Sequence, residues 1–141
     1  MPAEAKKDFE EAKLLKENAA KDFKAKDYNS ACDKYYKVIS VVRSNEKLKS
    51  TSQGKDICTT SRLNIALCKF TTKQYDEAID QCERVLDTEP KNWKASFRLA
   101  SSLFQRSNEN SSETELKTIC NYAKKALDGN PNDAKVKEFY T

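Results

Sequence analysis

The chain has 141 residues, of which 38% are hydrophobic and 34% are charged, and its formal net charge is +4. With only 2 glycines and 3 prolines, it has few of the residues that tight β-turns need, so the composition disfavours an all-β protein and favours an all-α one. The small net charge does not require a polyanionic partner, although it allows a local basic surface.

Two amphipathic helices are predicted in the first part of the chain. From about 8 to 26, apolar residues recur at spacings of three and four, the period of one helix face. A second helix is predicted from Tyr28 to about Arg43, with Ala31 and Tyr35 among its inward residues. Because only residues 25–27 separate the two segments, they should form an antiparallel hairpin.

The segment from Ser44 to Lys55 is predicted to be an exposed insertion. It is polar, and Leu48 is its only sizeable apolar residue. After it, a third helix is predicted over 57–71 and a fourth over 75–87, with Pro90 as the stop after the fourth.

A fifth helix is predicted from Trp93 to about Arg106, with Asn92 as its N-cap, and a polar loop should follow at 107–111.

The sixth helix has signals at both ends. Ser112 and Glu115 fit a capping box at its start. It is predicted to end near Asp128, with Gly129 as a left-handed cap.

A short pattern occurs twice along the chain. Residues 27–31, Asp-Tyr-Asn-Ser-Ala, return at 74–78 as Gln-Tyr-Asp-Glu-Ala, and an apolar pair follows each copy. A Tyr-x-x-Ala step repeated with the same downstream spacing indicates a helical-hairpin repeat. On a 34-residue period, Pro90 falls where tetratricopeptide repeats (TPRs) place their proline, and Trp93 falls at the first position of the next repeat. The chain therefore resembles a TPR protein.

The resemblance implies an all-α, right-handed superhelical solenoid of three TPR helix pairs plus the start of a seventh, capping helix. We expect a three-repeat TPR domain over 8–131. Its expected parts are repeat one at about 8–43, the insertion at 44–55, repeat two at about 56–90 and repeat three at about 92–131. Residues 132–141 should start the capping helix, with Asn132 as its cap.

In TPR co-chaperones the first helix of each pair lines a concave surface, and a carboxylate clamp on it grips the end of a peptide. Lys16, Asn64, Lys94 and Arg98 resemble four of the five clamp residues. Lysine and arginine donate charge-assisted hydrogen bonds to carboxylates, while an asparagine amide fixes orientation without adding charge. The fifth position, normally asparagine, is Ala20, so we expect a weaker or reshaped grip.

Other residues on the same helix faces are predicted to line the peptide groove. These are Lys13, Phe23, Leu67, Phe70, Phe97, Ser101 and Phe104. Two alternatives remain open for them, because a lysine on any solvated face can serve solubility alone and a phenylalanine can pack between helices.

The segments Leu63–Cys68 and Lys94–Arg98 are most similar to the C-terminal TPR domains of immunophilins, the FKBP-type and cyclophilin-type peptidyl-prolyl isomerases. The resemblance implies a co-chaperone adaptor that binds the acidic Glu-Glu-Val-Asp tail of heat shock protein 90, or the related tail of heat shock protein 70. The isomerase domain of that family would be a separate module, so this chain is not expected to be an enzyme.

Several function classes are disfavoured. Without histidine there is no Ser-His or Cys-His nucleophile, and no glycine-rich loop could hold a phosphate. The 5 cysteines include no Cys-x-x-Cys pair, so neither a metal nor another cofactor is expected. With no apolar signal segment or membrane span, we expect a cytoplasmic monomer without a membrane or nucleic-acid partner. The alternative function is a TPR scaffold that binds an internal peptide or a partner helix and needs no free carboxylate.

Overall fold

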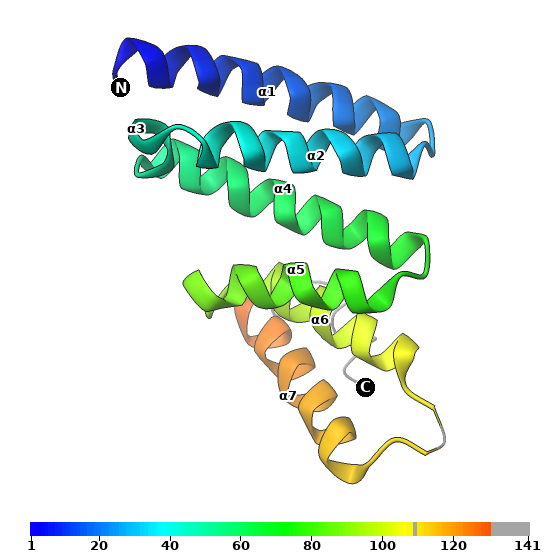
Figure 1. Cartoon of the computed structure of the whole chain (residues 1–141). Helices are drawn as coiled ribbons and strands as arrows, with labels where there is room; N and C mark the ends of the chain where they lie inside the picture. The colour runs from blue at the N-terminus through cyan, green and yellow to red at the C-terminus, as the bar shows by residue number, and fades with distance from the viewer. Residues whose placement is uncertain (109, 131–141) are drawn as a thin grey trace. The chain divides into compact units, whose positions relative to one another are not determined.

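The computed structural model describes residues 1–108 and 110–130, which form seven α-helices and no strand (Figure 1). The predicted all-α class is confirmed. The chain divides into two compact units, unit 1 at residues 1–68 and unit 2 from Lys69 onward. None of the helices in the described residues combines the length and the apolar character that a membrane span requires.

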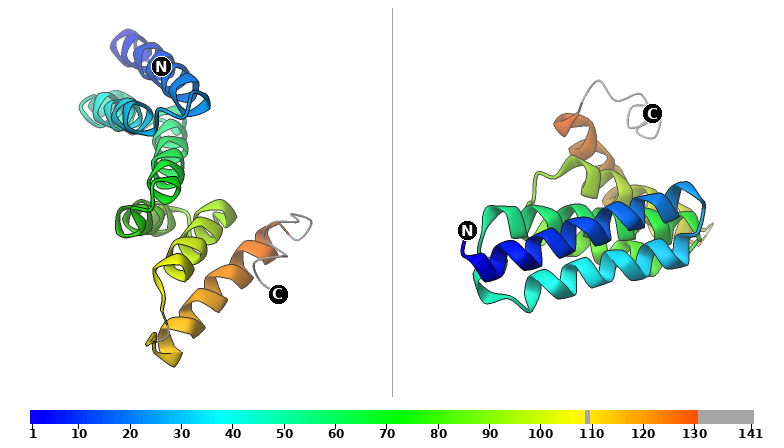
Figure 2. Two further views of the ribbon diagram at one scale, coloured as in Figure 1. Left: turned by 90° about the vertical axis from the view of Figure 1, so that its right-hand side faces the viewer. Right: turned by 90° about the horizontal axis from the view of Figure 1, so that it is seen from above.

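Unit 1 contains α1 (Ala3–Lys24), α2 (Tyr28–Arg43), α3 (Glu46–Lys49) and most of α4 (Ser52–Thr71). In Figure 1, α2 lies between α1 and α4, and the left view of Figure 2 shows that it is offset to one side of both. The predicted hairpin of the first two helices is confirmed, although α1 begins at Ala3 rather than near residue 8.

A stripe of alanines brings α1 close to α2. Ala5, Ala12 and Ala19 recur every second turn of α1, and each is fully buried. Two buried clusters form around this stripe. The first contains Ala5, Ala12, Val38, Val42, Leu48 and Ile57. The second contains Ala19, Ala31, Cys32, Tyr35, Ile39, Ile65 and Cys68. These clusters fix α1 and α4 against α2.

The predicted insertion at 44–55 is mostly exposed, but it is helical and is anchored in the core. Its residues form α3 and the first turn of α4, and Leu48 is fully buried. Thr51 closes the junction, because its hydroxyl donates to the carbonyl of Leu48 at 2.7 Å and accepts from the N–H of Gly54 at 2.9 Å. A Cβ at Gly54 would lie 2.1 Å from the Leu48 carbonyl oxygen, so this glycine permits a close approach rather than marking a loop.

Unit 2 contains the end of α4, α5 (Tyr75–Thr88), α6 (Trp93–Arg106) and α7 (Glu113–Gly129). The predicted N-caps of α6 and α7 are confirmed, because Asn92 accepts from the N–H of Ala95 at 3.0 Å and Ser112 accepts from that of Glu115 at 3.1 Å. Helix α6 packs against both α5 and α7. Its contact with α7 includes the buried residues Ala100, Ile119 and Ala123.

Gly129 was predicted to end the sixth helix in a left-handed conformation, and this is wrong. It is the last residue of α7, and among the described residues no glycine has a positive φ. A Cβ at this position would lie 2.5 Å from the Cβ of Trp93, so the glycine allows the end of α7 to approach the start of α6. The capping helix predicted at 132–141 lies outside the described residues.

The two left-handed residues among those described are Lys26 and Lys73, both with φ of 64°. They occupy the same position in the two copies of the repeated sequence, immediately before Asp27 and Gln74. In both turns the N–H of this lysine donates to the carbonyl three residues earlier at 3.0 Å. The next N–H donates to the carbonyl five residues earlier, at 2.9 Å and 2.7 Å. This is the Schellman pattern, which normally uses glycine at the left-handed position.

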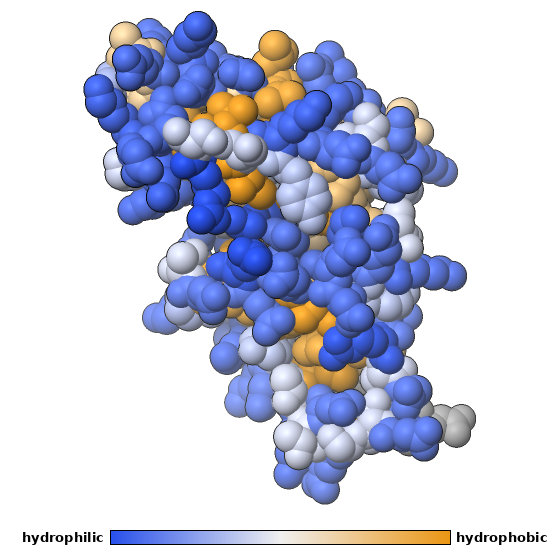
Figure 3. Space-filling view, in the orientation of Figure 1, coloured by the Kyte–Doolittle hydropathy of each residue, from blue (hydrophilic) through white to orange (hydrophobic). Residues whose placement is uncertain are grey.

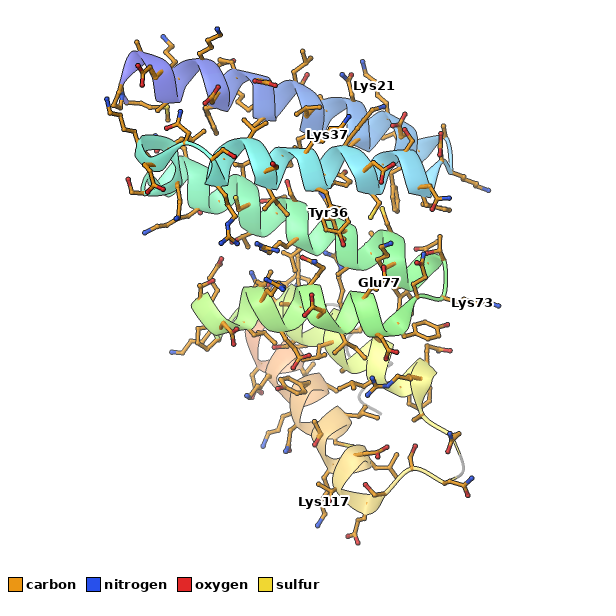
Figure 4. All side chains as sticks on the ribbon, in the orientation of Figure 1. Lys21, Tyr36, Lys37, Lys73, Glu77 and Lys117 are labelled. Atoms are coloured by element: carbon orange, nitrogen blue, oxygen red, sulfur yellow. The ribbon has the colours of Figure 1, made fainter. Side chains whose placement is uncertain are left out.

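We predict that Lys73→Gly increases the free energy of unfolding by about 0.5–1 kcal/mol, because glycine adopts a positive φ without the steric cost of a Cβ. The Lys73 side chain extends outward from the turn between α4 and α5 (Figure 4), so its removal leaves no cavity. Urea unfolding measured by circular dichroism tests this. Lys73→Ala is the control and should give no such gain, since alanine keeps the Cβ. Equal stability of the two variants would contradict the prediction.

Candidate functional site

A hollow of about 490 Å³ lies between α1 and α4 of unit 1. Helix α1 lines it with Phe9, Lys13, Lys16, Glu17 and Ala20, and α4 lines it with Gln53, Asp56, Ile57 and Thr60. The hollow therefore gathers Lys13, Lys16 and Ala20, which the repeat pattern placed on the ligand-facing surface. Ala20 makes this part of the wall small, which leaves room beside Lys16.

Helix α2 contributes no residue to this hollow. The face of unit 1 seen in Figure 3 is mostly hydrophilic with small apolar patches. Tyr36 of α2, labelled in Figure 4, is 40% exposed. The residues predicted for ligand binding in unit 1 come from α1 and α4 alone.

Four residues of the hollow were missed by the sequence analysis. Phe9 lies within the first predicted helix but was not among the residues predicted to face a ligand. Gln53 was assigned to the exposed insertion, and Asp56 and Ile57 were not considered as ligand-facing. The spacing of Phe9 from Lys13 and Lys16, which is four and seven residues, was a signal that could have shown the shared face.

Asn64 of α4 is half-buried and is held by a hydrogen bond with Tyr35 of α2. The Tyr35 ring belongs to the second buried cluster of unit 1, and its side chain is 3% exposed. Burial raises the pKa of the Tyr35 phenol, while the hydrogen bond with Asn64 acts to lower that pKa.

In unit 2 the predicted residues share one face of α6. Lys94, Phe97, Arg98 and Ser101 are three, four and seven residues apart on the helix, whereas the buried residues of α6 lie on the opposite side. Those buried residues are Ala95, Ser96, Leu99, Ala100 and Ser102. The predicted face is therefore the one that the core of unit 2 does not use. Phe104, farther along the same face, is 53% exposed.

The two cations of α6 differ in their surroundings. Lys94 is exposed, and its Nζ lies 5.8 Å from the centroid of the Trp93 ring, a cation–π contact. Arg98 is half-buried and near Cys82 of α5. Burial raises the pKa of the Cys82 thiol to about 12, against a smaller lowering by the Arg98 charge. Cys82 therefore stays a protonated thiol at neutral pH, as expected for a packed cysteine.

Phe23 and Phe70 both pack against a tyrosine at the start of the following helix. The Phe23 and Tyr28 rings have their centroids 5.2 Å apart at an interplanar angle of 72°. The Phe70 and Tyr75 rings are 5.7 Å apart at 60°. These edge-on contacts help to close both hairpins. The side of each phenylalanine ring that faces the tyrosine therefore stabilises the turn between two helices. Neither phenylalanine lines the hollow of unit 1.

The structure brings no metal-binding chemistry to these surfaces. Within residues 1–108 and 110–130, no group of three or more Cys, Asp or Glu side chains could hold a metal ion. The predicted clamp residues offer ammonium, guanidinium and amide donors, whereas the hollow also contains the carboxylates of Glu17 and Asp56. The donors of the clamp residues suit the carboxylates of an acidic peptide.

Among solved structures, the chain is similar to the C-terminal TPR-containing domain of an FK506-binding protein of Plasmodium falciparum. The TM-score is 0.79 at 25% identity, over 96% of this chain and 87% of that one. The chain has a tetratricopeptide-repeat fold. Two further TPR structures contain a bound peptide. The first TPR domain of Spaghetti, bound to the HSP90 peptide SRMEEVD, matches with a TM-score of 0.71 at 21% identity, over 92% of this chain and 86% of that one.

The second is the myosin chaperone UNC-45 from C. elegans in complex with an Hsp90 peptide. It matches this TPR chain with a TM-score of 0.73 at 20% identity, over 92% of this chain and 13% of that one. In sequence, sperm-associated antigen 1 of Rattus norvegicus is 37% identical over 99 residues. That match covers 70% of this chain and 9% of the rat protein. No family model matches the sequence.

Proposed function

We propose that this chain is a co-chaperone module that binds the acidic C-terminal tail of a heat-shock chaperone in an extended conformation. The observation that carries the proposal is the hollow of unit 1, where Lys13 and Lys16 lie beside the small Ala20 on one face of α1, with Glu17 and Asp56 also in the lining. The similarity of the fold to TPR structures that hold HSP90 peptides supports the same assignment.

Taken by itself, each unit carries two of the proposed clamp residues. In unit 1, Lys16 would pair with a carboxylate and Asn64 would donate an amide hydrogen bond. In unit 2, Lys94 and Arg98 would donate charge-assisted hydrogen bonds, each worth about 1.5–3 kcal/mol. Leu67, Phe97 and Ser101 are half-buried and would contact the apolar and main-chain parts of the peptide, with the exposed Phe104 at one end.

Heat shock protein 90 is the partner we propose first, because its peptide SRMEEVD is the ligand of the similar Spaghetti domain. A heat shock protein 70 tail presents a related acidic end and is the second candidate. The similarity to the TPR domain of an FK506-binding protein further supports a non-catalytic module of a larger immunophilin.

We predict that titration calorimetry with the free-acid peptide SRMEEVD gives one site per chain and a Kd of about 1–100 μM. Added salt should weaken this binding in part, because the clamp residues are exposed or half-buried and mobile ions screen such charges. A peptide of the same composition in scrambled order is the control. Equal affinity for both peptides would contradict the proposed recognition of the tail.

A further inference from the structure

We propose that Tyr35 is a positioning residue for the tail. Its phenol group, buried in unit 1, holds the side-chain amide of Asn64 in the orientation that presents an N–H group to the ligand carboxylate. The inference rests on the proposed function, which it deepens by adding a residue that does not touch the peptide.

Tyr35 is well suited to hold another side chain still. Its side chain is 3% exposed and packs among buried residues of α1, α2 and α4. Two of these, Ile65 and Cys68, belong to the same turns of α4 as Asn64. The phenol oxygen therefore has a fixed place relative to the backbone that carries the amide.

Asn64 needs such a partner because the last torsion of an asparagine side chain is broad and has no strong staggered preference. An amide nitrogen carries two N–H groups. The hydrogen bond with the buried Tyr35 phenol fixes the rotation of this amide. An N–H group left for the ligand then has a defined direction, and binding a carboxylate costs less conformational entropy.

Unit 2 has a buried residue and a clamp residue at the equivalent repeat positions. On the 34-residue repeat frame, Tyr35 and Cys82 occupy the same position of the second helix of a pair. Asn64 and Arg98 occupy the same position of the first helix of the next pair. Cys82 is fully buried and close enough to Arg98 to feel its charge. In both units, a buried residue from the second helix of one pair thus interacts with a clamp residue on the first helix of the next pair.

The test is Tyr35→Phe, which removes the hydroxyl and keeps the ring. Titration calorimetry with SRMEEVD should show binding weakened by about 3- to 10-fold, the effect of losing one hydrogen bond. Tyr28→Phe is the matched control, because the Tyr28 ring packs on Phe23 and its hydroxyl has no role in the clamp. It should leave the affinity unchanged.

A double-mutant cycle separates positioning from a general structural effect. In an Asn64→Ala background, Tyr35→Phe should cause no further loss of affinity, because there is no amide left to orient. An equal loss in both backgrounds would overturn the inference, and so would unchanged affinity of Tyr35→Phe alone.

Nuclear magnetic resonance of the ligand-free chain gives a readout that does not depend on binding. Tyr35→Phe should move the side-chain amide resonances of Asn64, and Tyr28→Phe should not. If the Asn64 resonances did not move, the inference about Tyr35 would be overturned, whereas the proposed function would not be affected. A wild-type chain that binds neither SRMEEVD nor its scrambled control would instead contradict the proposed function, and with it the role of Tyr35 in tail recognition.

Discussion

Replacing Arg98 by alanine is expected to lower the affinity for SRMEEVD by about 10- to 150-fold, the equivalent of one charge-assisted hydrogen bond. Arg98 is half-buried on the face of α6 that the core of unit 2 does not use. A guanidinium there can donate to a carboxylate with less competition from water than an exposed lysine can. Starting from a micromolar Kd, the loss should bring calorimetric binding close to or below detection.

Lys94→Glu should be at least as damaging, because it removes a donor and places a negative charge beside an acidic ligand. Arg106→Ala is the matched control on the same helix. Arg106 Nη1 pairs with Asp76 Oδ1 at 2.7 Å, and both side chains are more than half exposed. Its loss should cost about 0–1 kcal/mol of stability and leave binding intact. If Arg98→Ala binds the peptide as well as Arg106→Ala does, Arg98 is not part of the clamp.

The second large effect is expected in the core of unit 1. Leu48→Ala should lower the free energy of unfolding by about 2–5 kcal/mol, because a fully buried leucine leaves a cavity. Leu48 packs with Ala5, Val42 and Ile57, and Ile57 also lines the hollow. The variant should therefore weaken the site as well as the fold.

Leu14→Ala is the control for this prediction, since the same substitution is made in the same unit at a residue that is 59% exposed. It should change the free energy of unfolding by no more than about 0.5 kcal/mol. Urea unfolding followed by far-UV circular dichroism compares the two. Similar midpoints would contradict the anchoring of α3 in the core through Leu48.

Local signals made most helix boundaries predictable. Asp27, Asn92 and Ser112 each accept a hydrogen bond from a backbone N–H three residues later, and such a cap depends only on neighbouring residues. Helix α3 was missed even though Asn45 caps it in the same way, by accepting from the N–H of Leu48 at 3.0 Å. It has 4 residues, and a helix of one turn is stabilised by tertiary contacts such as those of Leu48 rather than by its own propensity.

Glycine signals were ambiguous for a physical reason. A glycine after a helical pattern can supply a positive φ or permit a close approach, and the sequence does not distinguish these two roles. Gly129 serves the second role, beside Trp93. The positive φ falls instead on Lys26 and Lys73, and lysine is not a residue from which it is predicted.

For the candidate site, the repeat frame indicated which helix faces would be exposed to a ligand, and the hollow of unit 1 contains several of those residues. The repeat frame could not indicate which residues each side chain contacts. The bond between Tyr35 and Asn64 joins two helices and depends on packing of α2 against α4. The edge-on contacts of Phe23 and Phe70 depend in the same way on the turn that follows each helix.

The proposed recognition of a free C-terminal carboxylate is tested most directly by titrating the wild-type chain with SRMEEVD as the free acid and as the C-terminal amide. Amidation removes the negative charge by replacing one of the two terminal carboxylate oxygens with an NH2 group, and it leaves every side chain of the peptide in place. We predict that the amide binds at least about 10-fold more weakly than the free acid. Equal affinity for the two peptides would contradict the clamp and favour a TPR scaffold that binds an internal segment.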